Sequence, residues 1–185
     1  MDYKELYIRI LDEHKGVFEK QNPEQLNAFL DLIYVHKRIF ILGVGREGIA
    51  ARGFAMRLMH LGKEVHWIWD DTTPGMNKGD LFIVINGSGE IGHLNYVLEQ
   101  AVKAGAVTSV VTGSPSGKAS GVANSLLFVP AAVYNGRDPV VESMQPMGNL
   151  FEQHLFMLFD IMVMLLEERL QLSHDEMAAR HRNVE

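Results

Sequence analysis

Apolar residues recur at a helical period up to Val35 and then gather in short runs separated by glycine. Between Tyr3 and Val35 this period predicts two helices, with a break at Asn22-Pro23. Beyond Val35, apolar runs of strand length alternate with helical stretches. Near-continuous apolar strands alternating with helices indicate a parallel sheet that is covered on both faces.

The predicted elements give an α/β fold class in a single domain covering residues 1–185. Strands are predicted over Lys37–Leu42, Val65–Trp69, Leu81–Ile85, Ala106–Thr112 and Leu126–Val129. Helices are predicted over Glu47–Leu61, Gly92–Ala104, Pro115–Ala123 and Asn149–Leu170, with a short one from His174 towards His181. The expected architecture is a three-layer αβα sandwich with a five-stranded parallel sheet, two N-terminal helices and a long C-terminal helix.

Composition narrows the classes of protein. A chain of 185 residues with 47% hydrophobic and 22% charged residues is expected to fold around one core. The net charge of −6 and the dispersed basic residues argue against nucleic acid as a partner. Cysteine is absent, which excludes disulfides and thiolate catalysis and, with no recognisable signal peptide, predicts the cytoplasm. The apolar stretch Leu155–Leu166 is too short to cross a bilayer, so no membrane is expected as a partner.

Two glycine-rich turns, each directly after a predicted strand, are the first candidate site. They are Gly43-Val44-Gly45-Arg46-Glu47-Gly48 and Asn86-Gly87-Ser88-Gly89-Glu90. Glycine lets the backbone approach a ligand closely, and a helix that begins after such a turn points free N–H groups at an anion. In an open parallel sheet, ligands bind at the carboxyl ends of the strands, where both turns fall. The long loop from Pro130 to Gly148 is a further functional candidate.

The first turn also matches a dinucleotide fingerprint, because Gly43-x-Gly45-x-x-Gly48 opens a helix and acidic residues follow at Asp70 and Asp71. Against this interpretation, Glu47 puts a carboxylate inside the turn, and two helices precede the first strand. A second mononucleotide-binding half is also missing. A nicotinamide or flavin cofactor is therefore disfavoured.

Several motifs together resemble the sugar isomerase (SIS) domain family, and most closely its 6-phospho-3-hexuloisomerases. They are Gly43-Val44-Gly45-Arg46, Ala55-Met56-Arg57-Leu58-Met59-His60-Leu61-Gly62, Thr72-Thr73-Pro74, Gly79-Asp80-Leu81, Gly87-Ser88-Gly89, Pro146-Met147-Gly148-x-x-Phe151-Glu152 and Arg180-His181-x-Asn183. The resemblance implies a flavodoxin-like sheet, a homo-oligomer that is commonly a tetramer, and active sites near subunit boundaries. It also implies isomerisation between 3-hexulose 6-phosphate and fructose 6-phosphate through an enediol, without a metal or redox cofactor.

The resemblance implies two catalytic residues, Glu152 as general base and His181 as a second proton-transfer group. Glu152 lies in the first turn of the predicted long helix, where the helix dipole favours a carboxylate. The alternative to a catalytic role is therefore that Glu152 only caps the helix or stabilises its dipole. A histidine near a chain end is more often simply solvated, which is the alternative for His181. His60 is interpreted as a packing or subunit-contact residue.

The candidate substrate-binding residues depart from the family pattern in their hydroxyl groups. These candidates are Gly45, Arg46, Glu47, Asn86, Gly87, Ser88, Gly89 and Ile91. The resemblance implies serine where Glu47 and Asn86 stand and threonine where Ile91 stands, so only Ser88 keeps its hydroxyl. An ionised Glu47 would repel a phosphate dianion unless Arg46 or Arg52 neutralised it.

Three interpretations of this departure stay open. In the first, the phosphate rests on Ser88, backbone amides and an arginine. In the second, the substrate carries a different polar group at that position, such as an amine or a neutral hydroxyl. In the third, the chain has lost catalysis and keeps oligomerisation or the sensing of a sugar or sugar phosphate.

Overall fold

The computed structural model describes residues 2–184. Two helices open the chain, α1 (Tyr3–Lys20) and α2 (Pro23–Val35). The break between them has a local cause, since the Asn22 side chain accepts hydrogen bonds from the backbone N–H groups of Glu24 and Gln25 while Pro23 occupies the first helical turn. The two leading helices predicted from the sequence are confirmed.

Strands and helices then alternate along the chain as the apolar runs predict, except between the second and third strands, which a loop joins. The order is β1 (Arg38–Leu42), α3 (Gly45–His60), β2 (Glu64–Trp67), β3 (Leu81–Ile85), α4 (Gly92–Lys103), β4 (Val107–Thr112), α5 (Lys118–Val122) and β5 (Ser125–Phe128). A loop ending in a short 3₁₀ turn (Pro146–Gly148) leads to α6 (Asn149–Leu170) and α7 (His174–Ala178). The last helix is shorter than predicted, because it ends before His181.

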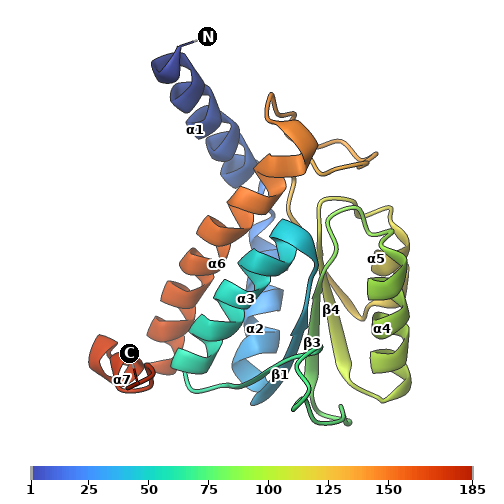
Figure 1. The fold of residues 1–185 in the computed structure, drawn as a ribbon, viewed down its shortest axis with the longest axis vertical. Helices are drawn as coiled ribbons and strands as arrows, with labels where there is room; N and C mark the ends of the chain where they lie inside the picture. Colours follow the sequence, from blue (N-terminus) through green and yellow to red (C-terminus); the bar gives the residue numbers. More distant parts are fainter. Residues whose placement is uncertain (1, 185) are drawn as a thin grey trace.

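The described strands form one five-stranded parallel sheet in the order β2-β1-β3-β4-β5. Figure 1 shows α2, α3 and α6 on one side of this sheet and α4 and α5 on the other, so the predicted three-layer αβα architecture is confirmed. β3 is buried along its whole length, as expected of a central strand covered on both faces. The order reverses between β1 and β3, and both glycine loops follow these two strands.

Helix α6 is the main helix of the core on its side of the sheet. It packs along α3, and the side chains of Phe54 and Phe159 stack with ring centroids 4.3 Å apart. By length and composition the stretch Pro146–Leu170 is apolar enough to cross a membrane, but half (50%) of its apolar 18-residue window is buried inside the fold. This burial agrees with the buried helix that the sequence predicts here.

Candidate functional site

The first glycine loop places two charged side chains at the start of α3. Gly45 has a φ of +55°, which favours glycine, and Arg46 and Glu47 follow it directly. A Cβ on Gly48 would lie 2.8 Å from the carbonyl oxygen of Gly43, so the tight turn also requires glycine there. Val44, the N-cap residue before the helix, provides no side-chain hydrogen bond, which leaves the first N–H groups of the helix free of side-chain acceptors.

Glu152 lies in the first turn of α6, opposite the first loop. Its side chain is 17% exposed, and its Oε2 lies 2.8 Å from Nε of Arg46. This oxygen accepts no hydrogen bond from a described residue, so the contact is an ion pair whose N–H group is not aimed at the oxygen. Burial raises the pKa of Glu152 above its usual range, and the charge of Arg46 opposes that rise. The two residues line a 300 Å³ pocket together with Ile49, Gln153 and Phe156.

The start of α6 depends on a glycine that the sequence motif contains. Gly148 has a φ of +79°, and a Cβ there would lie 2.5 Å from the backbone nitrogen of Tyr134. The helix can therefore begin at this point only with glycine in place. This explains in physical terms why the motif Pro146-Met147-Gly148 precedes Glu152.

Glu47 does not face solvent or an open anion site. Its Oε2 accepts the backbone N–H of Gly87 in the second loop at 3.0 Å, so the side chain joins the two glycine loops. Burial raises the pKa of Glu47 to about 7; the Gly87 hydrogen bond opposes the rise and the charge of Glu152 adds to it. Neither of the two arginines that could neutralise this carboxylate forms an ion pair with it, because Arg46 pairs with Glu152 and Arg52 lies 3.9 Å from Asp70.

Asn86 serves the second loop from within. Its side chain is fully buried, with Nδ2 donating to Asn95 Oδ1 at 3.0 Å and Oδ1 accepting from the Ile91 backbone at 3.5 Å. Both polar groups of the side chain are used within the protein, so a contact between Asn86 and a ligand stays a prediction. Gly89 has a φ of +71°, and a Cβ there would lie 2.9 Å from Cα of Gly117. The loop is packed too closely for any other residue at that position.

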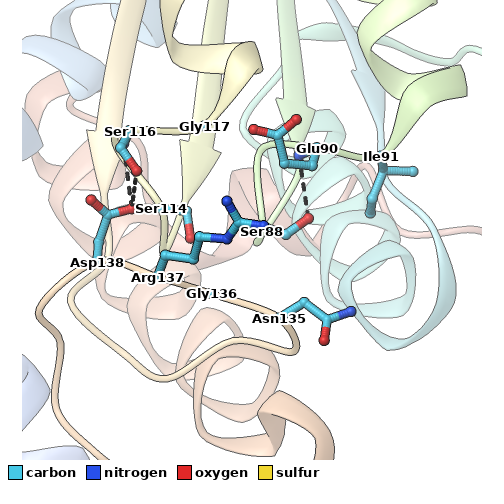
Figure 2. Close-up of a pocket in the computed structure, with 10 residues that line it drawn as sticks. All are labelled: Ser88, Glu90, Ile91, Ser114, Ser116, Gly117, Asn135, Gly136, Arg137 and Asp138. Carbon is cyan, nitrogen blue, oxygen red and sulfur yellow. Dashed lines mark hydrogen bonds between the residues drawn. The ribbon is translucent and has the colours of Figure 1, made fainter.

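A larger cavity of 920 Å³ lies beside the second loop. Figure 2 shows the residues that line it: Ser88, Glu90, Ile91, Ser114, Ser116, Gly117, Asn135, Gly136, Arg137 and Asp138. Of the predicted substrate-binding residues, only Ser88 and Ile91 line this cavity, whereas Arg46 lines the pocket of Glu152. Arg137 comes from the long loop that the sequence indicates as a functional candidate, within its run Asn135-Gly136-Arg137-Asp138-Pro139.

The long loop is held in place by the first helix. Glu13 accepts hydrogen bonds from the Ser143 hydroxyl at 2.7 Å, the Met144 backbone at 2.8 Å and the Gln145 amide at 3.0 Å. Burial raises the pKa of Glu13, but these hydrogen bonds outweigh burial and leave the pKa below its usual value. Helix α1 thereby fixes the segment that leads into α6 and Glu152.

Two histidines meet where α1 crosses α6. His14 Nδ1 lies 3.2 Å from His154 Nδ1, and Nε2 of His154 is buried without a hydrogen-bond partner among the described residues. Burial lowers the pKa of His154 to about 4, and the neighbouring His14 lowers it further. Both rings are therefore neutral at physiological pH.

His181 lies far from Glu152 within one chain. Its ring stacks on His60 at the C-terminal end of α3, with centroids 5.4 Å apart, and both line a 270 Å³ cavity. Arg46, which pairs with Glu152, lies at the other end of α3, roughly 21 Å from His60 along the helix axis at 1.5 Å per residue. His60 is 4% exposed and its carbonyl accepts from Arg180, which fits the packing role expected of it. Between residues 2 and 184 no group of three or more histidine, aspartate or glutamate side chains could hold a metal ion.

Comparison with known proteins places these features in a family. The SIS domain family matches residues 32–133. A Mycobacterium gastri protein named 3-hexulose-6-phosphate isomerase is 35% identical over 176 residues, which cover 95% of this chain and 88% of the relative. A Bacillus subtilis protein of the same name is 31% identical over 185 residues, covering both chains completely.

A solved structure has the same fold over nearly its whole length. It is a hypothetical protein from Methanococcus jannaschii, whose crystal structure infers a function of 3-hexulose-6-phosphate isomerase. It superposes with a TM-score of 0.85 at 28% identity, covering 98% of this chain and 99% of that chain.

Proposed function

Because the chain belongs to the SIS domain family, we propose that it is an isomerase that interconverts 3-hexulose 6-phosphate and fructose 6-phosphate. The observation that carries this proposal is the pairing of Glu152 with Arg46 in one pocket at the carboxyl edge of the sheet. The relatives that carry this name match nearly the whole chain, including the segment around Glu152. The cytoplasmic location expected from the absence of cysteine is part of the same proposal.

In the proposed reaction Glu152 removes the proton from C2 of the 3-hexulose. The electron pair forms the C2=C3 double bond of an enediol while the C3 carbonyl oxygen gains a proton. Return of a proton to C3 and loss of the proton on O2 leave the C2 ketone of fructose 6-phosphate. A raised pKa brings a carboxylate base closer to the operating pH, and Arg46 keeps it ionised and lies where it can stabilise developing negative charge.

The substitution Glu152→Gln tests this role. We expect turnover to be lost while stabilisation by fructose 6-phosphate in a thermal-shift assay stays nearly unchanged, because the amide keeps the shape but cannot take a proton. Glu168→Gln, an exposed glutamate on the same helix, is the matched control and should keep wild-type activity. Retained turnover in Glu152→Gln would remove Glu152 from the base role.

We further propose that the protein is a homotetramer and that His181 acts in the site of a partner subunit. This is supported by the positions of the two residues within one chain, where Glu152 pairs with Arg46 at the start of α3 and His181 stacks on His60 at its end, roughly 21 Å further along the helix axis. Ile49 and Phe156, which line the pocket of Glu152, are 61% and 45% exposed, as expected of a surface that another copy covers.

Mixing inactive variants tests this arrangement. Glu152→Gln and His181→Ala subunits are each expected to be inactive alone. Hybrid oligomers should regain activity, since a site formed by Glu152 of one chain and His181 of another is intact. If subunit exchange is verified by mass and no activity returns, His181 does not act across the interface.

A second candidate is a SIS module that binds a sugar or sugar phosphate without turning it over. It is favoured by the Glu47 carboxylate bound to the second loop and by the absence of a hydroxyl at Ile91. Such a module would bind fructose 6-phosphate yet incorporate no deuterium from solvent into the sugar. Deuterium incorporation by the wild-type protein contradicts this candidate.

A further inference from the structure

Three backbone N–H groups in and next to the second glycine loop, which could bind an anion, already donate hydrogen bonds to side chains of the protein. Glu47 accepts the N–H of Gly87 at 3.0 Å, Ser88 Oγ accepts that of Glu90 at 3.3 Å, and Asn86 Oδ1 accepts that of Ile91 at 3.5 Å. A phosphate seated on these N–H groups would have to displace three of the protein's own oxygens. The negative charge on Glu47 would also oppose it above about pH 7.

A cationic side chain faces the same loop from the other side of the cavity. Arg137 is the one arginine or lysine among the residues that line the 920 Å³ cavity, and Ser88 of the second loop lines the same cavity (Figure 2). It is exposed, and it forms no ion pair with any residue in the described part of the chain. A guanidinium group matches the geometry of a phosphate with two parallel hydrogen bonds.

The two carboxylates of the cavity have other partners. Asp138 Oδ2 accepts from the Ser116 hydroxyl at 2.7 Å, and Glu90 Oε1 accepts from the Lys118 backbone at 3.0 Å. Figure 2 shows the Asp138 carboxylate on the far side of the Arg137 stem from the guanidinium group. The bond to Ser116 fixes the segment that carries Arg137, and leaves the guanidinium group available to a ligand.

The wall of the cavity also contains an unsatisfied hydroxyl group. Ser114 is 3% exposed, and its Oγ has no hydrogen-bond partner among the described residues. Buried polar atoms are nearly always paired, and an exception at a cavity wall points to a ligand or water that completes it. The start of α4 next to the cavity has no side-chain cap, so its N–H groups add a favourable potential for an anion.

We propose that Arg137 binds the phosphate group of the substrate, with the hydroxyl groups of Ser88 and Ser114 beside it. The proposal rests on the proposed phosphosugar substrate and names the residue that replaces the missing hydroxyls of the second loop. The phosphate is then held between the second loop and the long loop of residues 130–148, and Glu47 keeps its place between the two glycine loops.

The test compares Arg137→Gln, Arg137→Lys and wild type in calorimetric titrations with fructose 6-phosphate, fructose and inorganic phosphate. A hydrogen bond to a charged group predicts that Arg137→Gln weakens binding of fructose 6-phosphate by about 10- to 100-fold and leaves fructose binding unchanged. Arg137→Lys should lose less, because lysine keeps the charge but not the paired donors. Arg169→Gln, at the far end of α6, is the control and should bind as the wild type does.

The outcomes separate this proposal from the proposed function. If Arg137→Gln binds fructose 6-phosphate as tightly as the wild type, the anchor is elsewhere, whatever the enzyme's turnover. If the wild type turns over no hexulose phosphate, and Arg137→Gln still weakens binding of fructose 6-phosphate but not of fructose, the isomerase proposal fails and the phosphate contact of Arg137 stands. An equal loss of fructose and fructose 6-phosphate binding would show a general defect of the loop and overturn the phosphate contact.

Discussion

The carboxyl group of Glu47 should make the stability of the protein depend on pH in a direction that one substitution can reveal. In the folded protein this group holds its proton up to a pKa of about 7, against an ordinary value of 4.5. Between these two values the folded state binds more protons than the unfolded state. The contribution of Glu47 to stability is therefore largest below pH 4.5, falls as the pH rises, and reaches its minimum above pH 7.

The size of the effect follows from the same two values. At roughly 1.4 kcal/mol for each pH unit, the rise from 4.5 to about 7 corresponds to about 3 kcal/mol of unfolding free energy. Glu47→Gln removes the titration and keeps an oxygen that can accept the Gly87 N–H. The variant should therefore gain about 3 kcal/mol relative to the wild type between pH 4.5 and pH 8.

The wild type alone will not show this slope clearly, because His154 opposes it. The pKa of His154 is lowered from 6.5 to about 4, so its contribution to stability is lost as the pH falls between these values. Only the difference between variant and wild type isolates Glu47.

Urea unfolding followed by circular dichroism, at several pH values and at one protein concentration, measures this difference. The fixed concentration matters because dissociation of subunits adds to the apparent stability. Glu168→Gln controls for the loss of a carboxylate as such. A constant difference between Glu47→Gln and wild type across pH 4.5 to 8 would refute the burial argument.

Two further predictions concern the residues around Glu152. Arg46→Ala removes the charge that lowers the pKa of Glu152, so the acid limb of the pH profile of kcat/KM should move to higher pH. If the acid limb does not move, Glu152 is not the group whose ionisation sets it. Gly148→Ala places a Cβ 2.5 Å from the Tyr134 nitrogen at a φ of +79°, and should lower the free energy of unfolding in urea by about 1–3 kcal/mol. Gly121→Ala, where a Cβ meets nothing within 4 Å, is the control and should change it less.

Most of the fold could be predicted because its signals are local. The run Leu81–Ile85 is a strand with the predicted bounds, and Asn149–Leu170 is a helix with the predicted bounds, since apolar pattern and glycine boundaries agree there. The helix from His174 ends at Ala178, where the apolar pattern had given no end signal. The alternation of strands and helices predicts a parallel sheet but not the order of its strands, which the structure shows to be β2-β1-β3-β4-β5.

The site was harder to predict because its contacts join distant segments. The sequence places Glu47 at a helix start, but its bond to Gly87 and its burial depend on how the two loops pack. Likewise Asn86 turns inward to Asn95, which no local pattern shows. Arg137 could be placed only on a long loop, because the path of that loop is set by Glu13 and Ser116 from other parts of the chain. The catalytic roles of Glu152 and His181 stay predictions until the variants are measured.

The hydrogen bonds of Glu13 have a consequence for how the chain can be shortened and how it can diverge. Figure 1 shows α1 projecting from the body, so it looks dispensable, yet its carboxylate at Glu13 holds three donors from residues 143–145. A truncation that removed this helix would release the segment in front of α6 and disturb a site at the opposite end of the sequence. Among relatives, position 13 and positions 143–145 are therefore expected to covary, because a new residue on one side leaves unpaired donors on the other.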